Sequence, residues 1–366
     1  MAIPSETKTW LDIASTTIEN YRPMFWDQIT DAIPLIKIIR QRDSITLDGG
    51  DGINETVMYA LNNTVGSYSG YDLLDLTPQE TFTTAKDDWK DIAGAVTFSQ
   101  DDIDRNRGKA QMKNLLQGRI KNLRLSYQSA LNTMLYRDGT GNSSKDINGL
   151  AKLVPDSATN TCHGINASAE SWWRNVSYCY DTTTADASPV GGYFGAQQGG
   201  TLNTYSIRNF LGNMLVDDNY NTTFLFCLDH VFDEITFGDT GPHLGVCTYK
   251  VYQRLKHSMF HNKQFLMEDT GRADPGFRHV NFNGIPVVFD RAIPSTTYGT
   301  STQDGRIYFL NLDFMRFYIH SMQNFRTTEA KELLPRQNAF SILTFLKAQW
   351  MIQKRNACAV LHSIWA

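Results

Sequence analysis

The chain has 366 residues, of which 20% are charged and 41% are hydrophobic, and its formal net charge is −4. This length permits two domains and a substantial core, and so mild a charge argues neither for nor against a nucleic-acid partner. The N-terminus shows no basic segment followed by an apolar run, and no stretch reaches about eighteen apolar residues, so we expect no signal peptide, no membrane-spanning helix and no membrane partner.

Residues 1–44 are predicted to form an N-terminal arm. A short amphipathic helix is expected around Trp10–Tyr21, and an apolar patch follows at Ile33–Ile39. Because this stretch is too short to be a domain by itself, we expect the arm to dock on another surface.

Residues 45–98 have the pattern of an extended β-hairpin loop. No Lys, Arg or His occurs from Asp43 to Ala85, and two candidate partner strands, Thr56–Leu61 and Phe82–Trp89, flank a tip rich in Gly, Ser and Tyr at Gly66–Tyr71. An isolated two-stranded hairpin is only marginally stable in water. We therefore expect the loop to take its stability from contacts outside itself, supplied by other copies of the chain.

A single helix of about forty residues is predicted next, at Ser99–Asp138, with a length near ~57 Å. The segment Ser99–Asp102 fits a capping box with Asp in its last position, and apolar residues recur at helical spacing from Ile103 to Leu135. Gly139 follows the last turn, as glycine commonly does. A soluble domain rarely needs so long a lone helix, which again favours a chain that completes its contacts with copies of itself.

The remainder of the chain alternates loops, short strands and helices. The apolar residues continue to the last residues, so we expect the C-terminus to be tied into a sheet. The elements predicted by periodicity and turn signals are helices at Thr201–Asp217 and Thr248–Asn262, and strands at Thr223–Leu228, Gly284–Asp290 and Arg306–Asn311.

Catalytic and ligand-binding motifs fail, so we predict neither an enzyme nor a cofactor. Gly66–Gly70 is no nucleophile elbow because its central residue is Tyr, and no P-loop occurs. His257 and His261 lie four residues apart but lack the Glu of a zinc motif, so we interpret them as a solvated helix face rather than a metal site. Cys162–His163 is interpreted as a loop position rather than a nucleophile pair. Free thiols are predicted for the five scattered cysteines: Cys162, Cys179, Cys227, Cys247 and Cys358.

Charge is distributed unevenly between the predicted hairpin and the predicted helix. Residues 44–91 hold nine acids and two bases, whereas residues 99–138 hold eight bases and four acids. One interpretation is a solvated loop beside a solvated helix; the other is that the hairpin of one copy lies on the basic helix of its neighbour, which would fix the register of assembly. The candidate intersubunit residues are Glu55, Asp72, Asp75, Glu80, Arg105, Arg107, Lys113, Arg119, Lys121 and Arg124.

The order of these segments, together with several short motifs, resembles the tailed-bacteriophage major capsid protein family, whose fold is shared with encapsulin nanocompartments. The motifs that carry the resemblance are Trp89, Gly94–Asp102, Asp138–Gly141, Gly149–Val154, Ser171–Asn175, Asn283–Val288 and Tyr308–Asn311. The resemblance implies an α+β fold with an arm, an extended loop, a peripheral domain and an axial domain. The implied boundaries are 1–44 (arm), 45–98 (extended loop), 99–144 (spine helix), 145–312 (axial domain), 313–356 (peripheral return strands) and 357–366 (closing axial strand).

The resemblance also implies a function as the major capsid protein of a virion. Copies would form hexamers and pentamers of an icosahedral shell around packaged double-stranded DNA, assembled in the bacterial cytoplasm with a separate scaffolding protein, a portal and a decoration protein. In the shells of this fold that are covalently crosslinked, a Lys of the extended loop is joined to an Asn of a neighbouring subunit. Because the loop has no Lys before Lys86, at its base, we expect no such crosslink. The alternatives are an encapsulin-like compartment that encloses an enzyme, and a soluble cytoplasmic α/β enzyme.

Overall fold

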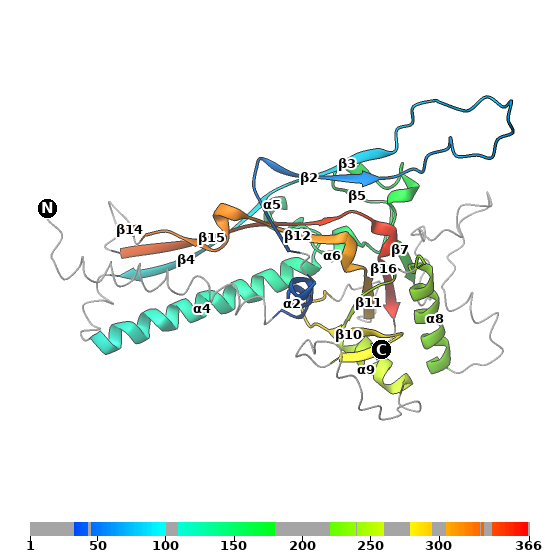
Figure 1. Ribbon diagram of the computed structural model, residues 1–366. Helices are drawn as coiled ribbons and strands as arrows, with labels where there is room; N and C mark the ends of the chain where they lie inside the picture. Colours follow the sequence, from blue (N-terminus) through cyan, green and yellow to red (C-terminus); the bar gives the residue numbers. More distant parts are fainter. Residues whose placement is uncertain are drawn as a thin grey trace.

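The computed structural model describes residues 33–42, 45–99, 109–179, 220–238, 240–259, 279–294, 305–329, 331–332 and 339–364. Over these ranges the chain is a mixed α+β protein with two six-stranded sheets, in agreement with the predicted fold class. A long helix, α4, runs along the first sheet toward one end of the molecule, and a hairpin loop projects at the other (Figure 1). The predicted helices at Trp10–Tyr21 and Thr201–Asp217 lie outside the described residues.

The first sheet is organised around one long strand, β15, with which β4, β12, β13 and β14 all pair. β4 lies antiparallel to β15 from the pair Ser99–Ala339 to the pair Lys90–Ala348. Alternate residues of β15 are buried, among them Phe340, Ile342 and Leu346, because one face of the sheet covers the core. The strands are β1 (Ile45–Asp48), β4 (Lys90–Ser99), β12 (Met315–His320), β13 (Arg326–Thr327), β14 (Lys331–Glu332) and β15 (Ala339–Ile352).

The second sheet has the order β7-β16-β11-β8-β10-β9 and mixes parallel with antiparallel pairs. The last strand of the chain, β16, lies between β7 and β11, so the predicted anchoring of the C-terminal strand in a sheet is confirmed. The two strands predicted from apolar runs are present as β10 and β11. The strands are β7 (Val176–Cys179), β8 (Leu244–Cys247), β9 (His279–Phe282), β10 (Ile285–Phe289), β11 (Gly305–Leu310) and β16 (Ala359–Ile364).

The long predicted helix exists: helix α4 spans Lys109–Tyr136, 28 residues. The segment that carries the predicted capping pattern lies, beyond Ser99, outside the described residues, and Ser99 itself is the last residue of β4, where it pairs with Ala339 of β15. The apolar stripe is confirmed: Ile120, Tyr127 and Leu131 are buried on the face that α4 turns to the sheet.

The apolar run predicted as a buried strand at Thr223–Leu228 is instead part of helix α8 (Tyr220–Glu234), so that prediction is wrong. Phe224, Cys227, Leu228 and Val231 are buried, which is the three-and-four spacing of a helix face. A short apolar run suits either structure, and the helix prevails because its buried face packs with helix α9 (Tyr249–Ser258) on the second sheet. Helix α9 itself confirms the prediction made for Thr248–Asn262 over its described part.

The remaining helices are short, and several of them contribute to the hydrophobic core beside the first sheet. The apolar patch Ile33–Ile39 forms most of α2 (Pro34–Gln41), and its isoleucines and leucine are buried in the core of the same chain. The small elements are α5 (Gly141–Ser144), α6 (Leu150–Leu153), η1 (Ser171–Trp173), η3 (Leu312–Phe314), η4 (Ser321–Gln323), η5 (Arg355–Ala357) and the strands β5 (Thr161–Cys162) and β6 (Ile165–Asn166). Within the described ranges, no helix has the length and apolar character required to cross a membrane.

Candidate functional site

The candidate site is the extended hairpin, which consists of β2 (Gly52–Met58), β3 (Phe82–Asp88) and the loop between them. The predicted pairing of two strands at this place is confirmed, with Thr56 opposite Thr84. Near its base the hairpin follows the period of two of a half-buried sheet: Ile53, Val57 and Ala85 are buried against the body. The hairpin therefore has a base that belongs to the folded body and an outer part that leaves it (Figure 1).

Glu55 lies on the same face as the buried residues of the base. Its carboxylate accepts a hydrogen bond of 2.7 Å from Gln353 Nε2 and another from the Tyr318 hydroxyl. Both oxygens therefore have donors within the same chain, and the pairing of Glu55 with a neighbouring copy stays a prediction. Its role in this structure is to hold β2 on the first sheet.

Asp87 holds β3, the other strand of the hairpin, on the body of the molecule. Its carboxylate accepts hydrogen bonds from the His163 ring at 2.9 Å and from the side-chain amide of Asn148. Burial alone would raise the pKa of the Asp87 carboxyl, but the hydrogen bond from His163 and the nearby charge of Lys152 outweigh it, so that this pKa lies below 3.8. The ionised carboxylate is thus the form that fixes the base of the hairpin.

This shift predicts a pH dependence of stability. Because the folded pKa of Asp87 is depressed, its contribution is complete above about pH 5 and is lost as the pH falls below 3.8 through the folded value. Asp87→Asn should lower the free energy of unfolding at pH 7 by about 1–3 kcal/mol and flatten its decline in acid. Urea titrations of the unassembled chain between about pH 2 and 7 measure both effects. Asp91→Asn is the control, since that side chain is 62% exposed, and an equal flattening there would contradict the assignment.

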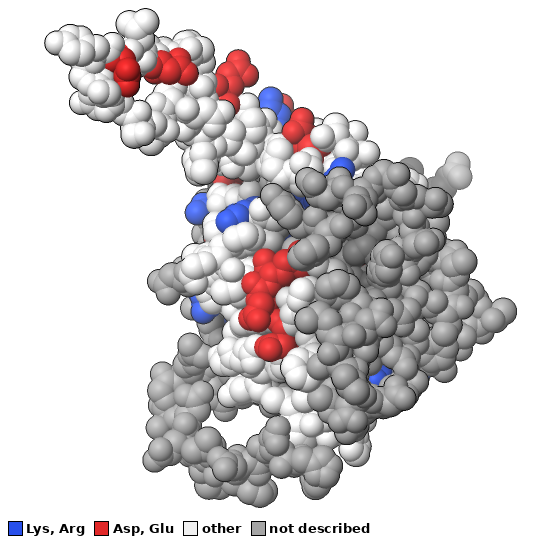
Figure 2. All heavy atoms as spheres, turned by 90° about the vertical axis from the view of Figure 1, so that its right-hand side faces the viewer, with Lys and Arg blue, Asp and Glu red and all other residues white. Residues whose placement is uncertain are grey.

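The outer part of the hairpin exposes an unusual number of large apolar side chains. Tyr71 and Leu73 are fully exposed, and Leu76 is 86% exposed. The others of this set, which we call the apolar tip, are Met58, Leu61, Val65, Tyr68, Leu74 and Phe82. Contiguous exposed apolar surface is normally a contact surface for another molecule. Figure 2 shows the outer part as a narrow projection on which the coloured side chains are acidic.

Local hydrogen bonds shape the tip even though it has no core. Asp72 accepts a bond of 2.7 Å from the Ser69 backbone N–H, and Asp75 accepts bonds from both the backbone and the hydroxyl of Thr77. The bonds from Thr77 lower the pKa of the Asp75 carboxyl. Such turns around Asp replace strand pairing. Two of the four acidic candidates, Asp72 and Asp75, therefore have a local structural role, whereas Glu80 is exposed.

The basic candidates on the helix fall into three groups. Arg119 contacts its own chain: it donates to the carbonyl of Thr97 and lies 4.9 Å from the ring of Phe98. Lys121 is exposed and Arg124 is half-buried on α4. The other three candidates, Arg105, Arg107 and Lys113, lie where the structure gives no side-chain description.

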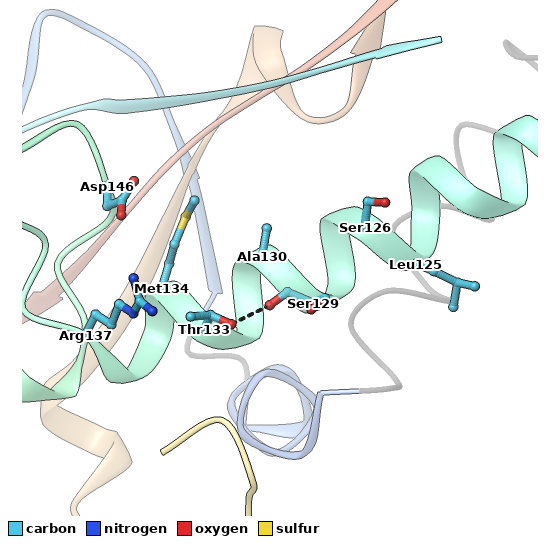
Figure 3. A pocket seen from close by; sticks show the side chains of 8 residues that line it. All are labelled: Leu125, Ser126, Ser129, Ala130, Thr133, Met134, Arg137 and Asp146. Atoms are coloured by element: carbon cyan, nitrogen blue, oxygen red, sulfur yellow. Dashed lines mark hydrogen bonds between the residues drawn. The ribbon is translucent and has the colours of Figure 1, made fainter. Parts of the chain in front are cut away.

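The face of α4 beyond these bases is hollowed. A shallow groove of about 560 Å³ runs along the C-terminal half of the helix. It is lined by the small side chains Ser126, Ser129, Ala130 and Thr133 together with Leu125, Met134, Arg137 and Asp146. Figure 3 shows Ser126 and Ala130 on the side toward the first sheet, and Leu125 on another side of the helix. No acidic residue occurs in α4, but the charged residues that line the groove, Arg137 and Asp146, lie outside the helix and have opposite signs.

Of the motifs considered for chemistry, Cys162 and His163 interact through their side chains, but both are buried. No group of three metal-ligating side chains gathers in the described ranges, and His261 of the helical His pair lies outside them. Cys162 is fully buried, as are Cys227, Cys247 and Cys358, all free thiols as predicted. His163 does not face an open site but the base of the hairpin, a position that sequence reasoning missed because its partners are far away along the chain.

Comparisons with known proteins support the fold through structure alone. No protein-family profile and no curated protein matches the sequence. Among solved structures, the cyanophage A-1(L) capsid asymmetric unit matches with a TM-score of 0.58 and 16% identity over 91% of this chain and 92% of that one. The capsid of a native GTA particle matches with a TM-score of 0.51 and 13% identity over 89% of each chain.

Another capsid-type shell shows a weaker likeness. The encapsulin complex of Synechococcus elongatus PCC 7942 has a TM-score of 0.48 and 9% identity over 90% of this chain and 88% of that one, which is too low to add to the argument. The two likenesses above it cover nearly the whole chain, so the fold is shown by structure and not by sequence.

Proposed function

On the premise that this chain has the phage capsid protein fold, we propose that it is a shell subunit that assembles with copies of itself. The observation that carries the proposal is the apolar tip, because exposed apolar side chains such as Leu73 do not stabilise a monomer. Burying one Leu on a neighbour contributes about 1.5–3 kcal/mol. Repeated around a closed ring of subunits, such contacts give a stable shell from a chain that is incomplete alone.

The finer proposal is a virion: hexamers and pentamers of an icosahedral head around double-stranded DNA, assembled in a bacterial host. The net positive charge of α4 supports it, since bases that face the interior of a shell would attract phosphate without base specificity. A scaffolding protein, a portal and a decoration protein are the partners that this proposal requires.

The purified chain should form closed particles visible by electron microscopy, and those isolated from the native source should contain double-stranded DNA. Particles that enclose an enzyme and no DNA would identify an encapsulin-like compartment instead. A monodisperse species near 41.4 kDa in every buffer would contradict the shell function and revive the soluble-enzyme alternative.

Within the shell we propose that the apolar tip and its acids lie along the groove and basic side of α4 in a neighbouring copy. The two elements are opposite in charge: the charged residues of the tip are acids, and those of α4 are bases. Such charge complementarity sets the rate and register of association more than its strength.

Glu80→Lys should slow assembly about tenfold at low salt, and combining it with Lys121→Glu should restore the rate. Glu80 is preferred over Asp72 because Asp72 also holds a turn of the loop. Light scattering follows the assembly rate at two salt concentrations. If Glu80→Lys assembles as fast as the parent at low salt, the charge pairing is wrong, although a shell could still form through apolar contacts.

A further inference from the structure

The two-residue turn between β5 and β6 places the side chain of His163 against the base of the extended hairpin. Its residues, His163 and Gly164, have φ values of 51° and 78°, so both are left-handed. This is the geometry of a tight hairpin turn, which Asn and Gly adopt easily and His rarely. A His held in an unfavourable conformation suggests that its side chain is needed there.

Three of the contacts that His163 makes reach two separate elements. Its carbonyl accepts the Lys86 N–H at 2.9 Å, and its Nδ1 lies 2.9 Å from the Asp87 carboxylate, both on β3. Its Nε2 accepts the backbone N–H of Ile352, on β15, at 3.3 Å. One fully buried imidazole thus links the hairpin to the central strand of the first sheet.

Two further side chains complete this attachment of β3. The side-chain amide of Asn148 donates to the Asp87 carboxylate, and its backbone N–H donates to the side-chain oxygen of Gln349, on β15, at 3.0 Å. Gln349 in turn donates to the carbonyl of Asp88 at 3.3 Å. The residues of β3 from Lys86 to Asp88 are therefore fixed from three directions.

The consequence is mechanical. The loop beyond the base extends over roughly ten residues on each side, about 35 Å at 3.3 Å per residue. A rotation of about 10° at the base therefore moves the tip by about 6 Å, more than the width of a side-chain contact. A hairpin that must meet one site on a neighbour needs its direction fixed at the base.

We propose that His163 is a positioning residue that sets the direction of the extended hairpin through its contacts with Asp87 and Ile352. The inference rests on the proposed shell function for its purpose, but not for its geometry. It concerns the unassembled chain, so it can be tested where no shell forms.

The test compares two substitutions that both tolerate the turn. His163→Gly keeps the left-handed backbone and removes both side-chain bonds, whereas His163→Asn keeps the backbone and places an amide donor where Nδ1 lay. Spin labels at Tyr71→Cys on the tip and Met322→Cys on the body report the direction of the hairpin by pulsed electron resonance. We expect His163→Gly to broaden the distance distribution about twofold, and His163→Asn to restore much of the parental width.

The matched control is Asn283→Gly. Asn283 and Gly284 form a turn of the same geometry, with φ values of 45° and 79°, and Asn283 donates to Asp229 at 2.6 Å. This turn joins β9 and β10, away from the hairpin, so its removal should leave the distribution unchanged. An unchanged width in His163→Gly, or equal broadening in the control, would overturn the proposal. If the parent forms no particles while His163→Gly still broadens the distribution, the shell function fails and the positioning role stands.

Discussion

The double substitution Leu73→Ser and Leu76→Ser is expected to abolish particle formation without changing the stability of the unassembled chain. Leu73 is fully exposed and Leu76 is 86% exposed, so neither contributes buried area to the monomer. If each is buried on a neighbour, their loss removes about 3–6 kcal/mol from every contact. That corresponds to a factor of about 10²–10⁴ in the association constant of one contact.

Two measurements on the same preparations check this expectation. Electron microscopy and sedimentation give the yield of particles, and urea titration gives the free energy of unfolding of the unassembled chain. The control is Phe226→Ser with Met322→Ser, two exposed apolar residues of the body at 44% and 74%. If the tip variant assembles at the parental concentration, or the body variant loses assembly equally, the tip is not the contact.

Gly149→Ala is expected to destabilise the fold by more than about 3 kcal/mol. The backbone of Gly149 has a φ of −99°, which any residue adopts, so the effect comes from contact alone. An added Cβ would lie 2.3 Å from the Met134 carbonyl oxygen, 2.4 Å from that of Arg137 and 2.6 Å from that of Leu135. These are backbone atoms at the end of α4, so the helix itself would have to move.

Gly118→Ala, within α4, is the matched control. A Cβ there meets nothing within 4 Å, and an alanine favours the helix by about 1 kcal/mol. Thermal and urea unfolding of the two variants should therefore shift in opposite directions. Equal shifts would mean that the close packing of Gly149 against α4 is not as described.

The sequence predicts a helix or strand well where the apolar residues keep one spacing over many residues. The alternation around Val57 and Ala85 with turn residues between them indicates a hairpin, and the stripe through Ile120 and Leu131 indicates a long helix. Both are confirmed because their signals extend over many residues. The run Thr223–Leu228 is too short to separate a strand from a helix, and the interpretation as a strand was wrong.

The charge pattern does not by itself predict the orientation of single side chains. Acid content predicts an acidic hairpin, but not which acid faces outward. Glu55 turns inward to Tyr318 and Gln353, residues more than 260 positions later, whereas Glu80 stays exposed.

By itself the sequence determined the hairpin, the long helix and the acidic character of the hairpin, because these depend on neighbours within a few turns or strand repeats. Only the tertiary structure decided how the hairpin is held. Asp87 meets His163 across 76 positions and Asn148 across 61, and Ile352 is bonded to His163 across 189. No local periodicity encodes such contacts, since they arise only when separate elements pack into one body.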